Sequence, residues 1–219
     1  MKKIIFISDY FVDQHLGGAE INDNTLIELL KKENLFHSKI NSNQVTEEFI
    51  VSNLDKLFVI SNFALLNMQL APYFALGEYV FYEHDYKFLA NRNPIIYPNF
   101  IAPEEKIINY NFYSNAKAII CLSKMHREIF EKNLDLDNCK NINCSLFDDK
   151  KINFLLSLNK KEKTRDYAIM KTNNPTKKML SCISWCKDRK LNYDLISHPD
   201  NDEFLNISIA LFLITTNSS

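Results

Sequence analysis

The sequence predicts an α/β protein built on a parallel β-sheet. Two observations lead to this prediction. Short β-rich runs alternate with stretches of helical pattern, and the runs at 3–8, 56–60 and 118–122 are almost continuously apolar. Such runs are typical of strands that helices cover on both faces, joined by right-handed crossovers. The 219 residues have room for one domain of ordinary size and part of another.

The first part of the chain has the pattern of a complete domain. Strands are expected at residues 3–8, 36–40, 56–60, 79–82, 118–122 and 141–144. Leu26, Leu29 and Leu30 have the i, i+3, i+4 spacing of a helix core face, so a first helix should begin near Ala19. These elements predict a Rossmann-like domain over residues 1–147, with a parallel sheet at its centre.

Two further helical segments and one turn complete this domain. Residues 104–114 are expected to be helical, and a helix should follow Ser123, whose hydroxyl is typical of an N-cap. Met125 and Ile129 would lie on one face of that helix. The sequence at 135–137 reads Asp-Leu-Asp, the DxD pattern of some metal-dependent enzymes. Because it stands between the end of a helix and a strand, we interpret it as a turn.

The sequence changes character in its last third. Residues 148–165 are rich in charge, contain a short helical pattern over 152–158, and are predicted to be a linker. Strand–helix alternation then restarts and predicts an incomplete second Rossmann-like unit over 166–219. Its strands are expected at 167–171, 193–197 and 210–215, and its helices at 177–189 and 202–207. An apolar stripe predicts the core face of the first of these helices and consists of Met179, Cys182, Ile183 and Cys186.

Composition and charge argue against several classes of protein. The 26 basic and 27 acidic residues leave a net charge of -1, whereas a nucleic-acid binder usually has a basic excess. Apolar stretches are far shorter than the about 20 residues that cross a bilayer. The apolar start reads as a strand rather than a signal peptide, because no cleavage site follows it. The five cysteines form no CxxC pair, so we expect buried thiols, no metal and a cytoplasmic location.

Two short polar sequences follow predicted strands, at the sheet edge where ligands bind in α/β folds. Gly17-Gly18 lies between the first strand and the first helix, where glycine allows close backbone approach and a helix N-terminus favours an anion or a polar sugar. The alternative is a flexible turn. Glu83-His84-Asp85 follows the strand at 79–82, and His84 is a candidate base or sugar contact. The alternative is a surface histidine.

A pair of lysines marks the corresponding edge of the second unit. Lys171 and Lys177 bracket a strand-to-helix loop, and two ammonium groups there suit a diphosphate. Isolated lysines are otherwise usually solvated surface charges. The GxGxxG pattern of dinucleotide sites and the GxxxxGK[ST] pattern of P-loops are both absent from the sequence.

Taken in order, these sequences resemble those of GT-B retaining glycosyltransferases of the glycosyltransferase family 4-like class. The first strand is followed by GGAE at 17–20, FYEHD at 81–85 is similar to a strand that ends in His-Asp, and AKAIICLS at 116–123 is similar to a strand before a helix. Lys171 and Lys177 stand where the family has an Arg and a Lys. Lys171 keeps the charge of that Arg but loses its planar fork.

The resemblance implies transfer of a sugar from a nucleotide diphosphate sugar to an acceptor hydroxyl, with retention and without a metal or further cofactor. Gly17 and Gly18 would lie near the donor phosphate, and His84 near the transferring carbon. Lys171 and Lys177 would neutralise the leaving diphosphate. The acceptor, a glycan or a lipid-linked acceptor, would bind the first domain. Peripheral membrane contact is common among enzymes of this kind, although the sequence has no strongly basic amphipathic helix to support it.

One departure from the family leaves two alternatives open. The family's E-x7-E segment, which contacts the donor, should begin just after Ser219, so we expect the chain to be truncated in its C-terminal domain. A non-catalytic GT-B remnant that acts as a binding module is therefore one alternative. A GT-B sugar-nucleotide 2-epimerase, which shares the fold and the phosphate contacts, is the other.

Overall fold

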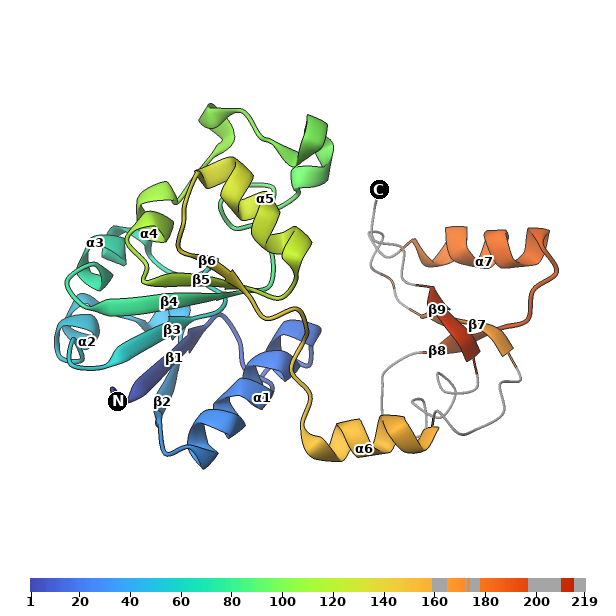
Figure 1. Cartoon of the computed structure of the whole chain (residues 1–219), viewed down its shortest axis with the longest axis horizontal. Helices are drawn as coiled ribbons and strands as arrows, with labels where there is room; N and C mark the ends of the chain where they lie inside the picture. Colours follow the sequence, from blue (N-terminus) through green and yellow to red (C-terminus); the bar gives the residue numbers. More distant parts are fainter. Residues whose placement is uncertain (159–164, 172, 174–177, 197–209, 215–219) are drawn as a thin grey trace. The chain divides into compact units, whose positions relative to one another are not determined.

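The computed structural model describes residues 1–158, 165–171, 173, 178–196 and 210–214 (Figure 1). The chain forms two compact units, Met1–Phe147 and Asp148–Ser219. Each unit has its own parallel sheet.

The first unit is built on a six-stranded parallel sheet, which confirms the predicted fold class. Its strands are β1 (Ile4–Ser8), β2 (Phe36–Asn41), β3 (Leu57–Ile60), β4 (Glu78–Glu83), β5 (Ala118–Cys121) and β6 (Cys139–Asn141). They are ordered β2-β1-β3-β4-β5-β6, and every neighbouring pair is parallel. In the centre of the sheet, Ile7 pairs with Ile40 on one side and with Ile60 on the other.

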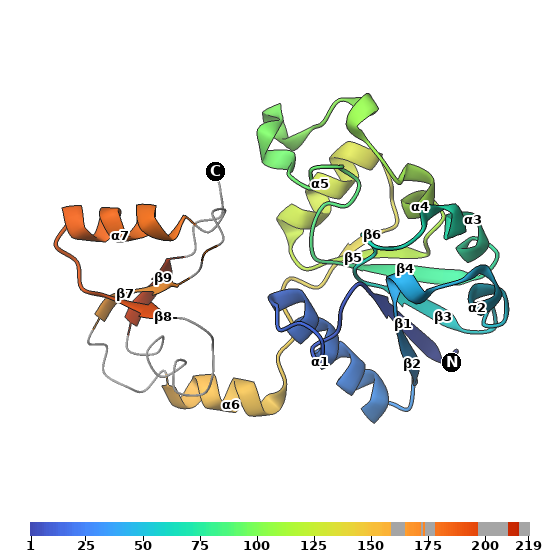
Figure 2. The same cartoon turned by 180° about the vertical axis from the view of Figure 1, so that it is seen from behind.

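Helices cover both faces of this sheet. They are α1 (Gly18–Lys32), α2 (Glu47–Val51), α3 (Ala71–Phe74), α4 (Tyr110–Ser114) and α5 (Lys124–Leu134). Short 3-10 turns lie between them, at Ser42–Gln44, Met68–Leu70, Pro94–Ile96, Pro98–Phe100 and Glu104–Lys106. Figures 1 and 2 show α1 on one face of the sheet, with α4 and α5 on the other.

Alternate residues of the strands pack into two separate hydrophobic cores, one on each face of the sheet. On the face of α1, Phe6 of β1 and Tyr82 of β4 pack with Ile27 in a small cluster. On the other face, a larger and strongly aromatic core includes Phe58, Phe81 and side chains from each of the helices α2 to α5. Near-continuous apolar strands are what two covered faces require, and the sequence pattern predicted this arrangement.

The buried face of α1 differs from the one that the leucine spacing predicted. Leu26 and Leu30 are half-buried against the small cluster, but Leu29 is 41% exposed. The first half of the helix instead buries polar residues, among them Glu20 and Asp23. These polar side chains lie at the end of the helix nearest the carboxyl edge of the sheet, where a cleft replaces the hydrophobic core.

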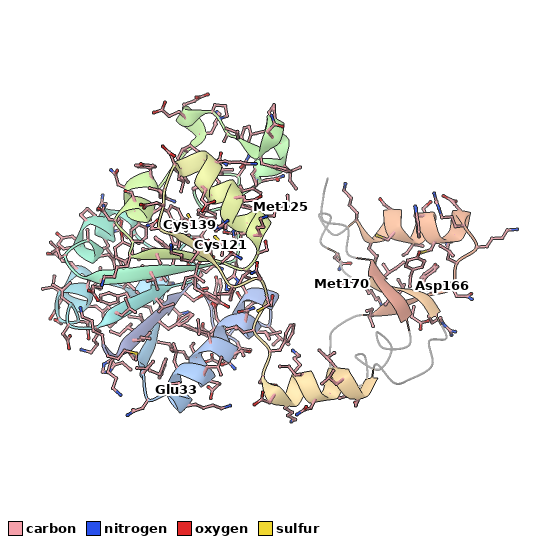
Figure 3. All side chains as sticks on the ribbon, in the orientation of Figure 1. Glu33, Cys121, Met125, Cys139, Asp166 and Met170 are labelled. Atoms are coloured by element: carbon pink, nitrogen blue, oxygen red, sulfur yellow. The ribbon has the colours of Figure 1, made fainter. Side chains whose placement is uncertain are left out.

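The helix after Ser123 forms as expected, with one correction. The Ser123 hydroxyl accepts a hydrogen bond from His126 N at 3.1 Å, as an N-cap does. Ile129 is buried, but Met125 is 53% exposed and the prediction that it shares the buried face is wrong (Figure 3). His126 takes the buried position instead, because its ring packs edge-on against Phe130.

Two boundaries also shift from their predicted positions. The sixth strand lies at Cys139–Asn141 rather than at 141–144, because buried Cys139 pairs with Ile119 and the left-handed backbone of Asn143 follows the strand. Within 104–114 only the 3-10 turn and α4 are helical, since Ile107 between them forms a bridge to Leu89. The DxD sequence is a turn, as predicted, with Asp135 in the left-handed C-cap of α5.

The second unit contains a short three-stranded sheet. Its elements are α6 (Asp149–Leu158), β7 (Arg165–Met170), α7 (Met179–Asp188), β8 (Tyr193–Ile196) and β9 (Ala210–Ile214), and the parallel strands are ordered β8-β7-β9. The predicted stripe of α7 is its core face, since Cys182 and Cys186 pack on Ile169 of β7. The expected helix at 202–207 lies outside the described residues.

The cysteines and the apolar segments were also predicted from the sequence. Four of the five cysteines are buried, as predicted, whereas Cys144 is exposed because it follows β6 rather than belonging to a strand. In the part of the chain that the structure describes, no helix has the length and apolar character that crossing a bilayer requires.

Candidate functional site

The candidate site lies where the order of the strands changes direction. From β1 the chain passes through α1 to β2 on one side, whereas β3 leads on to β4 on the other side. The loops that leave the carboxyl ends of β1 and β3 therefore diverge. In open parallel sheets this switch point opens a crevice in which ligands bind.

A cleft of about 520 Å³ occupies this position. It is lined by residues of the loops after β1, β3 and β4 and of the first turn of α1, namely Asp9, Tyr10, Gln14, His15, Glu20, Asn62, Ala64, Leu65 and Arg92. The lining mixes carboxylates, amides and two aromatic rings, a composition that suits a polar organic ligand.

Asp9 joins the two loops that form the walls of the cleft. Its carboxylate accepts hydrogen bonds from the backbone N–H groups of Ala64, at 2.9 Å, and Leu65, at 3.0 Å, and from the Ser42 hydroxyl. The Asp9 carbonyl accepts a further bond from Asn41 Nδ2 at 2.9 Å. With these partners, Asp9 holds the loops together and has little capacity left for a ligand.

His84 is held by a buried carboxylate. Its Nε2 lies 2.7 Å from Asp23 Oδ1, and Asp23 is 1% exposed on α1. The second oxygen of Asp23 accepts from the hydroxyls of Ser61, at 2.6 Å, and Ser8, at 3.3 Å. A carboxylate can only accept, so Nε2 of neutral His84 carries the proton and Nδ1 keeps its lone pair. This is the arrangement of an oriented histidine that can accept a proton or a hydrogen bond.

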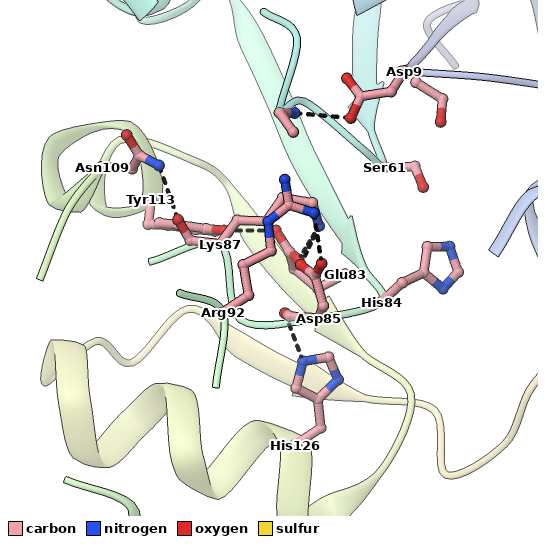
Figure 4. A network of polar contacts seen from close by, with 12 residues as sticks. Asp9, Ser61, Glu83, His84, Asp85, Lys87, Arg92, Asn109, Tyr113 and His126 are labelled. Atoms are coloured by element: carbon pink, nitrogen blue, oxygen red, sulfur yellow. Dashed lines mark hydrogen bonds and ion pairs between the residues drawn. The ribbon is translucent and has the colours of Figure 1, made fainter. Parts of the chain in front are cut away.

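A buried ion-pair cluster supports the loop that carries His84 (Figure 4). Lys87 Nζ lies 2.8 Å from Glu83 Oε2 and 2.8 Å from Asp85 Oδ1, and Tyr113 donates to Glu83 Oε1 at 2.8 Å. Arg92 contacts Asp85 at 3.2 Å. Glu83 and Lys87 precede and follow His84 in the chain, so the cluster fixes the backbone on both sides of the histidine.

The lysine of this cluster is charged. Burial lowers the pKa of Lys87, but the charges of Glu83 and Asp85 outweigh it, and the net shift of the pKa is upward. Burial raises the pKa of Glu83, which by itself favours a neutral carboxyl. These shifts disagree about the state of the pair. The contacts favour the ion pair, because Lys87 has two carboxylate partners and Tyr113 donates to Glu83.

His126 anchors the same loop from α5. Its Nε2 lies 3.1 Å from the carbonyl oxygen of Asp85, and burial lowers the pKa of the ring to about 4. An unfolded chain takes up this proton near the ordinary pKa of about 6.5, before the folded protein does. The folded state is therefore destabilised as the pH falls from about 6.5 towards 4.

This difference predicts an acid-sensitive stability. Between pH 7 and pH 5, His126 should lower the free energy of unfolding by about 2 kcal/mol, since one pKa unit corresponds to about 1.4 kcal/mol. Urea unfolding of His126→Gln at both pH values should show a smaller loss than wild type. The exposed His37→Gln variant is the control and should keep the full loss. Equal losses in all three proteins would contradict this role of His126.

The glycine pair begins α1 beside the cleft. Gly17 is the N-cap with φ -124°, so neither glycine is required for a left-handed backbone. A Cβ on Gly17 would clash with Glu20 Oε2, whereas one on Gly18 would meet nothing within 4 Å. Gly17 therefore leaves room for the Glu20 carboxylate, and Gly18 faces open space at the start of the helix.

The structure brings some of the predicted site residues together. Gly17 and Gly18 begin the helix whose Asp23 holds His84, so these three belong to one edge of the first sheet. Lys171 directly follows β7 in the second unit, where its side chain is exposed and its backbone N–H donates to Ile196. Lys177 lies outside the described residues.

Three residues of this edge were not predicted from the sequence. Asp23 and Glu20 belong to the polar first half of α1, and Asn62 lies in the loop after β3. The signal that could have found Asn62 is its place after an apolar strand.

Among the described residues, no three His, Cys, Asp or Glu side chains gather in a way that could hold a metal ion. Neither the models of known protein families nor the curated proteins include a match to this chain.

Proposed function

We propose that this protein is a GT-B type glycosyltransferase that moves a sugar from a nucleotide diphosphate sugar to an acceptor hydroxyl with retention. The observation that carries the proposal is the oriented His84–Asp23 pair next to the glycine loop, at the switch point of a parallel sheet. The sequence resemblance assigns the sugar chemistry, and this edge of the sheet is where such folds bind ligands.

Residues of each unit have a role in the proposed reaction. Nδ1 of His84 would accept a hydrogen bond from the sugar, while Asp23 fixes the ring and Gly18 leaves space for close approach. In the second unit, Lys171 would stabilise the negative charge that develops on the leaving diphosphate.

Donor turnover by the full chain tests the proposal. UDP-, GDP- and ADP-glucose are offered separately, and release of the nucleoside diphosphate is followed together with the anomeric configuration of the product. Release with retention is the expected result. Interconversion of the nucleotide sugar without release would favour a 2-epimerase, and folded protein that binds no nucleotide would favour the binding module.

Lys171→Ala should weaken binding of the free nucleoside diphosphate by about 10-fold or more, because a charge-assisted hydrogen bond to phosphate contributes about 1.5–3 kcal/mol. Calorimetry with UDP and GDP measures this affinity. Lys187→Ala, an exposed lysine in the last turn of α7, is the control and should bind like wild type. Unchanged affinity in Lys171→Ala would remove this lysine from the donor site.

A further inference from the structure

Glu20 is a buried carboxylate without a partner. The residue is 7% exposed and lines the cleft, and none of the described side chains or backbone groups forms a hydrogen bond or an ion pair with its carboxylate. Its position in the first turn of α1 is favourable for a negative charge. That interaction does not supply hydrogen-bond donors, which a buried carboxylate otherwise finds in the protein or in a ligand.

Asn62 also lines the cleft and contains an unsatisfied acceptor. Its Oδ1 atom is buried and has no hydrogen-bond partner. Two other charged groups of the cleft have partners: Asp9 accepts from two backbone N–H groups and a hydroxyl, and one guanidinium nitrogen of Arg92 donates to Asp85. Among the described residues, Glu20 is therefore the carboxylate of the cleft that lacks a hydrogen-bond or ion-pair partner.

We propose that this cleft binds an amino sugar, whose ammonium group pairs with Glu20 and whose neighbouring hydroxyl contacts Asn62. That the ligand is a sugar rests on the proposed function, whereas its positive charge rests on Glu20 alone. An ammonium group supplies three donors to a carboxylate that has none. The ring of Tyr10, which is 48% exposed, and the exposed Leu65 side chain supply apolar surface for a sugar ring. The amino sugar would be the acceptor in the transfer reaction.

The charge of the cleft predicts an order of affinity among three simple probes. Glucosamine should bind about tenfold or more tightly than glucose, since a charge-assisted contact contributes about 1.5–3 kcal/mol. Glucose 6-phosphate should bind most weakly, because its anion would face Glu20. Titrations of the full chain at about pH 6.5, where the amine is protonated, are followed by amide chemical shifts. The largest shifts should fall at residues 17–20 and 62–65.

Glu20→Gln keeps the shape of the side chain and removes its charge, so it should abolish the preference for glucosamine over glucose. Glu28→Gln is the matched control on the same helix, because Glu28 is exposed and pairs with Lys31 at 2.7 Å. It should keep the preference. If Glu20→Gln does not fold, the amide chemical shifts of the wild-type protein still test the proposal, because they show whether glucosamine binds at the cleft.

Three results would overturn the proposal. Glucose 6-phosphate could bind as tightly as glucosamine, the shifts could avoid the cleft, or the preference for glucosamine could survive in folded Glu20→Gln. None of these titrations contains a nucleotide. Absence of donor turnover together with Glu20-dependent binding of glucosamine would therefore reject the proposed glycosyltransferase activity and support the proposed amino-sugar site in the cleft. Donor turnover without binding of glucosamine would reject only the proposed amino-sugar site.

Discussion

Replacing Lys87 by Met should lower the free energy of unfolding by about 3–5 kcal/mol, the cost of removing one partner from a buried ion pair. Lys87 is 3% exposed and Glu83 is fully buried, so the carboxylate would be left with Tyr113 as its hydrogen-bond donor. The aliphatic part of methionine fills most of the volume of the lysine. The loss therefore reports the uncompensated charge rather than a cavity. Urea unfolding followed by circular dichroism measures it.

A double variant separates charge from packing. Glu83→Gln together with Lys87→Met removes both charges and should recover a large part of the loss, because no ion then lacks a partner. Lys117→Met is the control: Lys117 pairs with Glu78 at the surface, its side chain is 57% exposed, and its loss should cost about 1 kcal/mol or less. A similar small cost for Lys87→Met would show that Glu83 is neutral in the folded protein.

The sheet could be predicted from the sequence because its strands are buried on both faces. The strands at Ile4–Ser8 and Leu57–Ile60 are apolar almost throughout, and few other structures give such short apolar runs between helical patterns. The strand order could not be predicted in the same way. It depends on which face each connection crosses, and the position of the cleft between β1 and β3 follows from that order.

The residues that build the site were harder to predict than the sheet. Hydrophobic periodicity identifies a buried helix face by its apolar residues, and in α1 it selected Leu29, which is exposed. Glu20 lines a polar cleft and Asp23 is buried against two serine hydroxyls and His84, and no apolar pattern marks such a helix face. Lys87 likewise reads as a surface residue in the sequence, since a lysine is rarely buried without a carboxylate partner that only the fold can supply.

Asp23→Asn should reduce the turnover of a nucleotide sugar by about 10²-fold or more, if the proposed transfer reaction is correct. Asp23 is a positioning residue, because it acts through His84 rather than on the substrate. An asparagine can offer its NH₂ group to Nε2, which would move the proton of His84 to Nδ1 and remove the acceptor that faces the sugar. Loss of a well-placed acid–base group typically costs about 10²–10⁴-fold.

The pattern of the kinetic loss distinguishes positioning from folding. Asp23→Asn should lower kcat far more than it raises KM, since the carboxylate sets the orientation and the tautomer of His84. Asp13→Asn removes an exposed carboxylate that pairs with Lys39 at 2.6 Å, and should turn over like wild type. Ser61→Ala, which deletes one donor to Asp23, should give an intermediate loss. If Asp23→Asn kept wild-type turnover while folded, His84 would have to act without its carboxylate, and the pair could no longer carry the proposed function.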